Sequence, residues 1–123
     1  MDINKLQDEV NRTGELINVT LTDSLQLEPL NRLKIENCKL KSVDITSNQS
    51  IDIINSNIEY LNVDFKRGSI SADSGTKLGK VKIEGSGNDS VVNFKASKIS
   101  QLELSKVRVH LFDNGRIDLL KGD

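Results

Sequence analysis

The chain has 123 residues, with 17 basic and 18 acidic residues, one histidine and one cysteine. This length suits a single domain, and the formal net charge of −1 gives no electrostatic reason to bind nucleic acid or a membrane surface. The lone Cys38 excludes an internal disulfide, and one cysteine with one histidine excludes a conventional structural zinc site.

The sequence shows no targeting or anchoring segment. Its first residues lack a basic stretch followed by an apolar stretch, so no signal peptide is predicted. No apolar run approaches the roughly 20 residues that span a bilayer. Together with the unpaired cysteine, these features predict a soluble protein in a reducing, cytoplasmic setting, without a cofactor.

The first element expected along the chain is a short capping helix over residues 2–12. Its apolar residues fall on one helical face, and they are Ile3, Leu6 and Val10. Asn4 and Gln7 have the spacing of a capping box. Gly14 suits the point where the chain leaves a helix.

An internal repeat follows this helix. Residues 33–45 and 51–63 superimpose without a gap at an offset of 18. Each copy has apolar residues at its first and third positions, a small residue at its sixth, an apolar residue at its eighth, and apolar residues at its eleventh and thirteenth. Weaker copies place the coil starts near positions 17, 33, 51, 70, 92 and 109.

This repeat predicts a solenoid of short strands. An apolar–polar–apolar triplet forms a strand with one buried face, and two polar residues between triplets allow a bend. Three such strands close a triangular coil, and stacked coils bury like side chains upon like. We therefore predict an all-β fold: a right-handed parallel β-helix of five to six coils, with about 18 residues in each coil. Residues 1–16 form its N-terminal capping segment and residues 17–123 form the β-solenoid.

The repeat also predicts which residues stack in columns inside the solenoid. One apolar column contains Ile17, Leu33, Ile51, Ile70, Val92 and Val109, and another contains Leu27, Val43, Leu61, Val81 and Leu102. A third column is small throughout and contains Thr22, Cys38, Ser56, Gly75 and Ser97. Cys38 is therefore interpreted as a packing residue rather than a nucleophile. On the outside, Asn37 and Asn55 are expected to stack at one corner.

Three other folds account less well for the repeat. A left-handed hexapeptide helix needs an apolar residue at every sixth position, and Lys39 between Leu33 and Ile45 breaks that spacing. A leucine-rich repeat fits residues 30–40, but its repeats are longer than 18 residues. A β-sandwich does not require a gapless repeat.

The five-residue steps from Cys38 to Val43 and from Ser56 to Leu61 resemble those of pentapeptide-repeat proteins, over residues 33–65. The triangular core of about six windings is similar to that of the bactofilins, which are bacterial cytoskeletal polymers. Both resemblances concern architecture, so they imply a solenoid fold more than a function.

Three large apolar residues of the third coil fall at positions predicted to point outward: Ile54, Tyr60 and Phe65. Grouped exposed apolar side chains mark interfaces, and tyrosine is a common interface anchor. These residues form the predicted protein-binding site, unless a loop or the capping helix covers them.

No catalytic cluster is evident in the sequence. The nearest approach is an outward column whose alternating charges favour cross-strand salt pairs; it contains Asp44, Asn62, Lys82 and Glu103. His110 is predicted to point outward on the last coil, with no nucleophile or paired carboxylate beside it. We therefore do not expect an enzyme.

The later coils carry a basic group, which contains Lys77, Lys80, Lys82, Lys98, Lys106 and Arg108. It offers a surface for an acidic partner, but Glu84, Asp89 and Glu103 are interspersed. Phosphate binding also needs a denser positive field. These features favour an ordinary solvated surface.

The leading functional hypothesis is a non-catalytic protein-interaction module of the inhibitor, immunity or adaptor type. The alternatives are a self-assembling structural protein that stacks through its terminal coil, and a trimeric fibre domain. They arise because the C-terminal residues show no cap comparable to the N-terminal one, although Phe112 is placed to cover the last coil.

Overall fold

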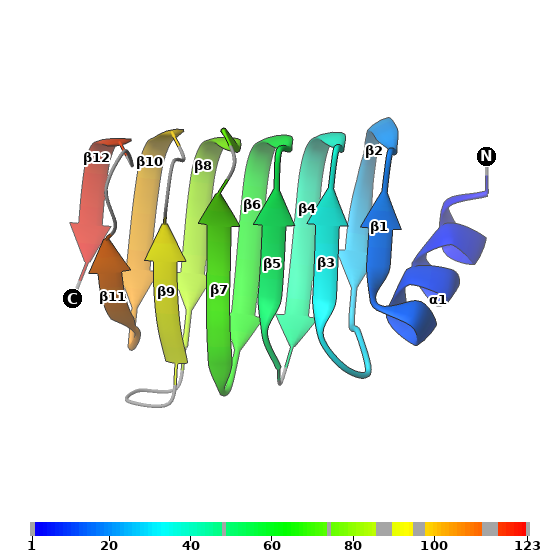
Figure 1. Ribbon diagram of the computed structural model, residues 1–123, viewed down its shortest axis with the longest axis horizontal. Coiled ribbons are helices and arrows are strands. Elements are labelled where there is room, and N and C mark those ends of the chain that lie inside the picture. The colour runs from blue at the N-terminus through cyan, green and yellow to red at the C-terminus, as the bar shows by residue number, and fades with distance from the viewer. Residues whose placement is uncertain are drawn as a thin grey trace.

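The protein is a β-solenoid with one N-terminal helix (Figure 1). The computed structural model describes residues 2–47, 49–73, 75–85, 90–94, 98–111 and 116–122, without the side chains of residues 90, 93, 94, 108–111 and 116–122. The helix is α1 (Ile3–Thr13). A short-strand sheet contains β1 (Glu15–Ile17), β3 (Leu33–Glu36), β5 (Ile51–Ile54), β7 (Gly68–Asp73), β9 (Ser90–Phe94) and β11 (Arg108–Leu111). A long-strand sheet contains β2 (Thr20–Leu27), β4 (Lys39–Ser47), β6 (Asn57–Phe65), β8 (Lys77–Glu84), β10 (Lys98–Ser105) and β12 (Arg116–Gly122).

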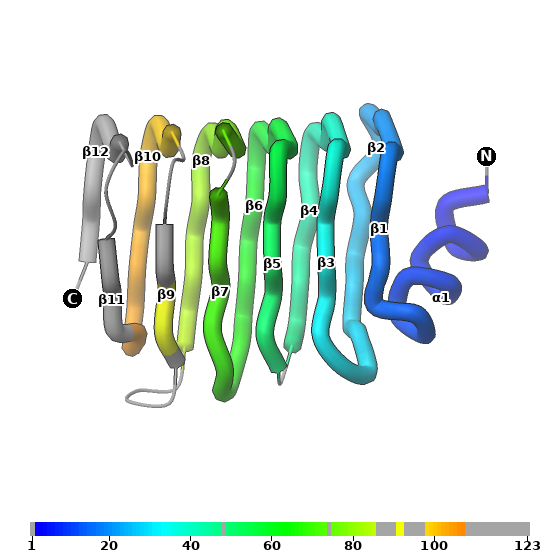
Figure 2. Tube along the Cα trace, viewed as in Figure 1, coloured from blue at the N-terminus to red at the C-terminus, as the bar shows by residue number. Residues whose placement is uncertain are grey.

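The chain winds in a right-handed path. In Figure 1 the short strands lie in front and run upward, the long strands lie behind and run downward, and successive pairs move away from α1. This is the hand that parallel crossover connections adopt, and Figure 2 follows the path as a tube from α1 through β8. The predicted fold class is confirmed, with about four turns rather than five to six.

The strands β9 to β12 extend both sheets, but the corners at residues 95–97 and 112–115 lie outside the described residues. The roles predicted for Ser97, Asp89 and Phe112 fall there as well. His110 pairs through its backbone with Asn93, and its side chain also lies outside the part of the chain that the structure describes.

Each turn contains a bend inside its long strand. In β4 the inward Leu40 and the inward Val43 are separated by two residues, Lys41 and Ser42, that both face away from the core. The second and third short strands predicted for each coil are therefore one continuous strand with a bend. At the same bend in β8, a side chain on Gly79 would meet the carbonyl oxygen of Glu59, so only glycine fits without a shift.

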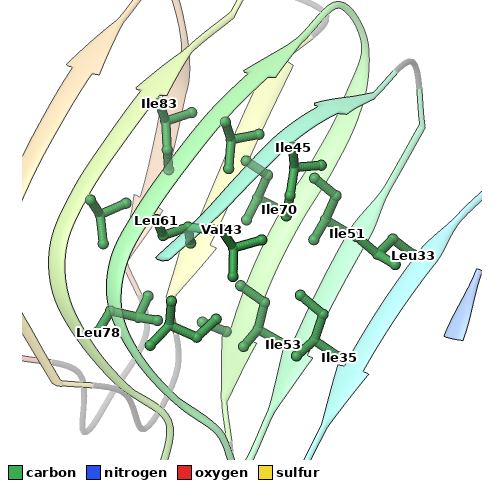
Figure 3. Close-up of a cluster of buried hydrophobic side chains, with 14 of the residues drawn as sticks. Leu33, Ile35, Val43, Ile45, Ile51, Ile53, Leu61, Ile70, Leu78 and Ile83 are labelled. Atoms are coloured by element: carbon green, nitrogen blue, oxygen red, sulfur yellow. The ribbon is translucent and has the colours of Figure 1, made fainter. Parts of the chain in front are cut away.

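The two predicted apolar columns are confirmed from the second coil onward, for the side chains that the structure describes. Backbone pairing places Leu33, Ile51, Ile70 and Val92 in one register, and it places Val43, Leu61, Val81 and Leu102 in another. All eight side chains are buried. Figure 3 shows the aliphatic side chains of both sheets meeting between them, with Val43 beside Leu61 and Leu33 near Ile51. The core is built from branched aliphatic residues, which suit strands and fill space in fixed rotamers.

The first coil does not follow the predicted register. Ile17 pairs with Glu36 instead of joining the Leu33 column, and the neighbouring Leu16 enters the core beside Ile35. The predicted start at position 17 is therefore wrong. The physical reason is that this coil begins earlier, at the residue where the helix ends, and carries one extra residue.

That extra residue forms a bulge between Leu21 and Ser24 of β2. After the bulge, Leu25 rather than Leu27 pairs with Val43, so the column predicted for Leu27 is also wrong. The prediction for Thr22 fails for the same reason: Thr22 is exposed, and Val19 takes its place next to Cys38. A bulge adds one residue to one strand only, and apolar spacing alone does not show where it falls.

Beyond the first coil, the small column differs from the prediction at one described position. Lys77 pairs with Asn57, so the residue before it, Thr76, lies beside Ser56 and is fully buried. Gly75, which was predicted for this place, is exposed at the preceding turn, where its φ of 81° favours glycine. The inserted residue of this coil therefore precedes the small position instead of following it.

The helix α1 caps the N-terminal end of the solenoid. Val10 is buried, and the half-buried Ile3 and Leu6 pack against the core, so the predicted apolar face is confirmed. Gly14 ends the helix in the left-handed conformation and donates its N–H to the Val10 carbonyl oxygen at 2.7 Å. This covers apolar side chains that the first coil would otherwise expose.

Polar side chains of α1 also accept backbone N–H groups from the edge strand β2 and from the residue that follows it. Gln7 Oε1 accepts the N–H of Gln26, and Asn11 Oδ1 accepts the N–H of Glu28, both at 2.8 Å. The predicted capping box of Asn4 and Gln7 is wrong, because Gln7 makes this edge contact. Asp2 caps the helix instead, with its carboxylate accepting the N–H of Lys5 at 3.3 Å.

Phe65 lies in the core, 1% exposed, so its predicted outward position is wrong. The inward alternation of β6 continues past Leu61 and Val63 to Phe65. Its neighbours in the column are small: Ser47 pairs with it from β4, and Gly85 follows the residue that pairs with Asp64. The phenyl ring therefore has room that an aliphatic column would not leave.

Replacing this ring tests its burial. We expect Phe65→Ala to lower the free energy of unfolding by about 3–5 kcal/mol, because it leaves a cavity in the core. Tyr60→Ala removes an aromatic ring from the outside of the same strand and is expected to lower it by less than about 1 kcal/mol. Urea unfolding followed by circular dichroism measures both. Equal effects of the two substitutions would contradict the assignment of Phe65 to the core.

Candidate functional site

The structure separates the three residues predicted to bind a partner. Tyr60 projects from the outer face of the long-strand sheet and is 47% exposed, as predicted. Ile54 ends β5 in the other sheet, where it is half-buried between Glu36 and Asp73 of the adjacent rungs. Phe65 is in the core. The three residues therefore do not form one patch. Of the three, Tyr60 is the residue whose large side chain is exposed enough to contact a partner.

The bend of the long strand explains the exposure of Tyr60. Glu59 and Tyr60 occupy the two consecutive outward positions of β6, between the buried Ile58 and Leu61. Tyr60 stacks between Ser42 on one rung and Lys80 on the next. Because the backbone of each rung is hydrogen-bonded to its neighbours, the ring projects from a rigid support.

A shallow groove of about 290 Å³ surrounds Tyr60. Apart from Leu61 and Val81, its other lining residues are polar or charged, and they include Ser42, Asp44, Asn62, Lys80, Lys82 and Glu103. We call this surface the Tyr60 face. An aromatic side chain within a polar rim is an arrangement typical of interface anchors.

The column of alternating charges forms part of this face. Asp44, Asn62, Lys82 and Glu103 are in register, as predicted. The predicted salt pairs between them are absent: among the described residues, ion pairs join Arg32 to Asp52 and Lys34 to Glu36, and both lie elsewhere. The charges of Asp44, Lys82 and Glu103 therefore stay available to a partner.

A second feature is the asparagine corner between the short and long strands. Asn18, Asn37 and Asn55 have left-handed φ values of 58°, 54° and 46°. Asparagine tolerates this conformation better than other residues with side chains. The predicted stacking of Asn37 and Asn55 is confirmed by the Nδ2 of Asn55, which donates to Oδ1 of Asn37 at 2.6 Å.

Asn18 was missed as a member of this corner. Its backbone N–H donates to the Glu36 carbonyl oxygen at 3.0 Å, as that of Asn37 does to Ile54 at 3.1 Å. The offset of 19 residues between Asn18 and Asn37 hid the equivalence, because the other coils were aligned at 18. The sequence signal was an asparagine just before a small or branched inward residue in each of the first three coils.

The small column lies under this corner and is linked by hydrogen bonds. The N–H of Cys38 donates to Ser56 Oγ at 3.1 Å, and the N–H of Ser56 donates to Thr76 Oγ1 at 3.3 Å. Cys38 is 1% exposed, and its Sγ lies 3.3 Å from the carbonyl oxygens of both Leu16 and Glu36. The interpretation of Cys38 as a packing residue agrees with this environment.

Burial raises the pKa of the Cys38 thiol, and the nearby Glu36 carboxylate acts in the same direction. Hydrogen bonds with the backbone of Val19, Glu36 and Asn18 oppose this rise without cancelling it. The thiol therefore stays protonated at neutral pH and is a poor nucleophile.

Comparison with known proteins finds no matching family, no matching curated protein and no matching solved structure. No helix within the described residues is long and apolar enough to cross a membrane. Nor does that part of the chain bring three or more His, Cys, Asp or Glu side chains together as metal ligands. The fold thus defines a β-solenoid repeat protein, and the geometry of its surfaces carries the functional argument.

The state of Cys38 can be tested with a thiol reagent. We expect slow modification of the folded chain and fast modification in urea, with Cys38→Ser as the control that gives no signal. Because the folded pKa is raised, the thiol leaves stability unchanged below its ordinary pKa and lowers stability as the pH rises above it. Urea unfolding across that alkaline range, with Cys38→Ser as reference, measures this effect. Rapid modification without denaturant would contradict the buried assignment.

Proposed function

We propose that this chain is a non-catalytic protein-interaction module, of the inhibitor, immunity or adaptor type, and that the Tyr60 face docks its partner. The observation that supports this proposal is the exposure of a large aromatic side chain on a rigid sheet. Among the described residues, Tyr60 and Leu30 are the exposed large hydrophobic residues, and Leu30 lies in a loop near α1.

The surroundings of Tyr60 support docking of a protein. Charges of both signs border the ring, and Asp44 and Lys82 have no ion-pair partner in the described part of the chain. Charges arranged in this way select a complementary partner and set its orientation. The rungs beneath are held by backbone pairing from β4 to β10. Little ordering is then required when a partner binds.

The cellular setting is part of the same proposal. We place the module in the cytoplasm, because its single cysteine is buried and unpaired. Thiols of this kind persist in reducing compartments.

Self-assembly is the competing proposal, either by end-to-end stacking or as a trimeric fibre domain. β11 and β12 are the last strands of their sheets in the described chain, whereas α1 lies against the first strands. The edge of a sheet offers unpaired backbone groups to another copy. Light scattering over a wide range of protein concentrations separates these functions. A constant monomer mass supports the interaction module, a fixed trimer mass supports the fibre domain, and a mass that grows with concentration supports stacking.

The docking proposal is tested by Tyr60→Ala. We expect this substitution to weaken binding of the physiological partner by more than about 1 kcal/mol, because it removes the central anchor. The partner is first captured from cell extract by a photo-crosslinking residue at position 60, and its affinity is then measured by calorimetry. The control is Lys34→Ala, which removes a side chain from the opposite sheet. Unchanged affinity of Tyr60→Ala would exclude the Tyr60 face as the docking surface.

A further inference from the structure

The start of each long strand carries a column of outward polar residues beside the asparagine corner. Lys39, Asn57, Lys77 and Lys98 occupy equivalent positions on β4, β6, β8 and β10, and all four are exposed. Stacked rungs lie about 4.8 Å apart, so Lys39 and Lys98 are separated by roughly 14 Å along the solenoid. This column and the asparagine corner run parallel to each other along the axis.

An open groove of about 480 Å³ lies between the corner and the column. We call it the amide–lysine groove, and its polar lining includes Asn18, Asn37, Asn55, Asn57, Lys39 and Lys77. None of its described lining residues is acidic. Glu36 lies on the other side of the corner, where it forms an ion pair with Lys34 at 3.7 Å. The groove is therefore positively charged, although the whole chain has a net charge of −1.

The polar groups of this groove are largely unused by the fold. Among the described residues, the side chains of Lys39, Lys77, Asn18 and Asn57 form no hydrogen bond or ion pair. Asn37 accepts one hydrogen bond through Oδ1, which leaves its Nδ2 hydrogens for another group. The left-handed backbone explains why asparagine occupies position 18, but the side chains of all four residues stay available to a ligand.

The groove is also fixed in position. The N–H groups of Lys39, Asn57 and Lys77 donate to the previous rung at 2.9, 2.9 and 2.8 Å. The left-handed asparagines are held on the other side by the bonds described above. A ligand therefore meets side chains on a backbone that is already ordered, which lowers the entropy lost on binding.

We propose that the amide–lysine groove binds an extended acidic segment of a partner protein. The lysines neutralise its Asp or Glu carboxylates. The asparagine carboxamides match its backbone, because each carries both a donor and an acceptor, as a peptide group does. A nucleic acid is a poorer match, since its backbone presents closely spaced phosphates and needs a denser positive field than the two lysines of the groove, with Lys98 beyond them, provide. The segment that fits is about four to five extended residues long.

This site is separate from the Tyr60 face and does not depend on it. Asn57 and Tyr60 lie on the same strand, but the amide–lysine groove and the groove around Tyr60 share no lining residue. The groove therefore adds a second binding surface, with a defined ligand chemistry, to the proposed module. A Tyr60→Ala variant should bind an acidic peptide as the wild type does, so failure of one proposal leaves the other testable.

The test uses a fluorescein-labelled peptide of alternating Glu and Ser residues, about eight residues long so that it covers the groove. Fluorescence anisotropy at low ionic strength measures its affinity for the full chain. We expect saturable binding that weakens as salt is added. A peptide of the same length with Lys in place of Glu should not bind.

Two variants locate the binding. Lys77→Gln should weaken affinity about two- to fivefold, the effect of one exposed ion pair. Asn37→Gly keeps the left-handed backbone, removes the carboxamide, and should weaken affinity by roughly two- to tenfold. Lys34→Gln changes the net charge equally on the other sheet and should have no effect. Circular dichroism and the unfolding midpoint confirm that each variant is folded.

Three results would overturn this inference. The first is an absence of binding to the acidic peptide at low ionic strength. The second is an equal loss of affinity in Lys77→Gln and Lys34→Gln, which would show attraction to net charge alone. The third is tighter binding of a single-stranded oligonucleotide of matched length than of the peptide, which would assign the groove to nucleic acid.

Discussion

The in-register stacking of parallel coils is the constraint on which the rest of this structure depends. Each rung donates and accepts backbone hydrogen bonds along the axis, so a residue is fixed directly above its equivalent in the previous coil. Inward positions must then pack against their own kind, which explains the aliphatic columns around Val43 and Leu33. Where a column contains one large ring, Phe65, its neighbours Ser47 and Gly85 are small. Packing within a column therefore sets residue size as well as polarity.

The same constraint explains which parts of the fold could be predicted. The gapless copies at residues 33–45 and 51–63 revealed the solenoid and its inward apolar columns, because the apolar positions repeat there. The first coil was misread because the bulge near Leu21 changes the register within one strand. The small position was assigned to Gly75 instead of Thr76 for a similar reason. An extra residue at a turn leaves the apolar spacing on both sides of the turn unchanged. The spacing of apolar residues gives only the number of residues between them. Which residues are buried depends on where in the coil the extra residue is placed.

The candidate site was predicted only in part, for a related reason. Tyr60, Ile54 and Phe65 were grouped because all three interrupt the repeat within one coil. A turn of solenoid has several sides, so neighbours in sequence face different directions. The asparagine corner between β5 and β6 places Tyr60 on a different sheet from Ile54. Large residues at irregular positions show that the repeat pattern is broken there. Whether such a side chain points inward or outward depends on bends and neighbouring rungs, which the sequence does not display.

Stacking orders the outer surface as well as the core, and the two have different physical origins. Inward columns are uniform because packing requires it, and the asparagine corner repeats because its backbone is left-handed. No such requirement applies to the outward positions of Lys39, Lys77 and Lys98. Exposed like charges on nearby rungs weaken the fold slightly. A column of lysines without acidic partners is therefore unfavourable for the isolated chain, and it becomes favourable when carboxylates from another protein lie along it. That asymmetry is the physical reason to look for function on the outer columns of this solenoid.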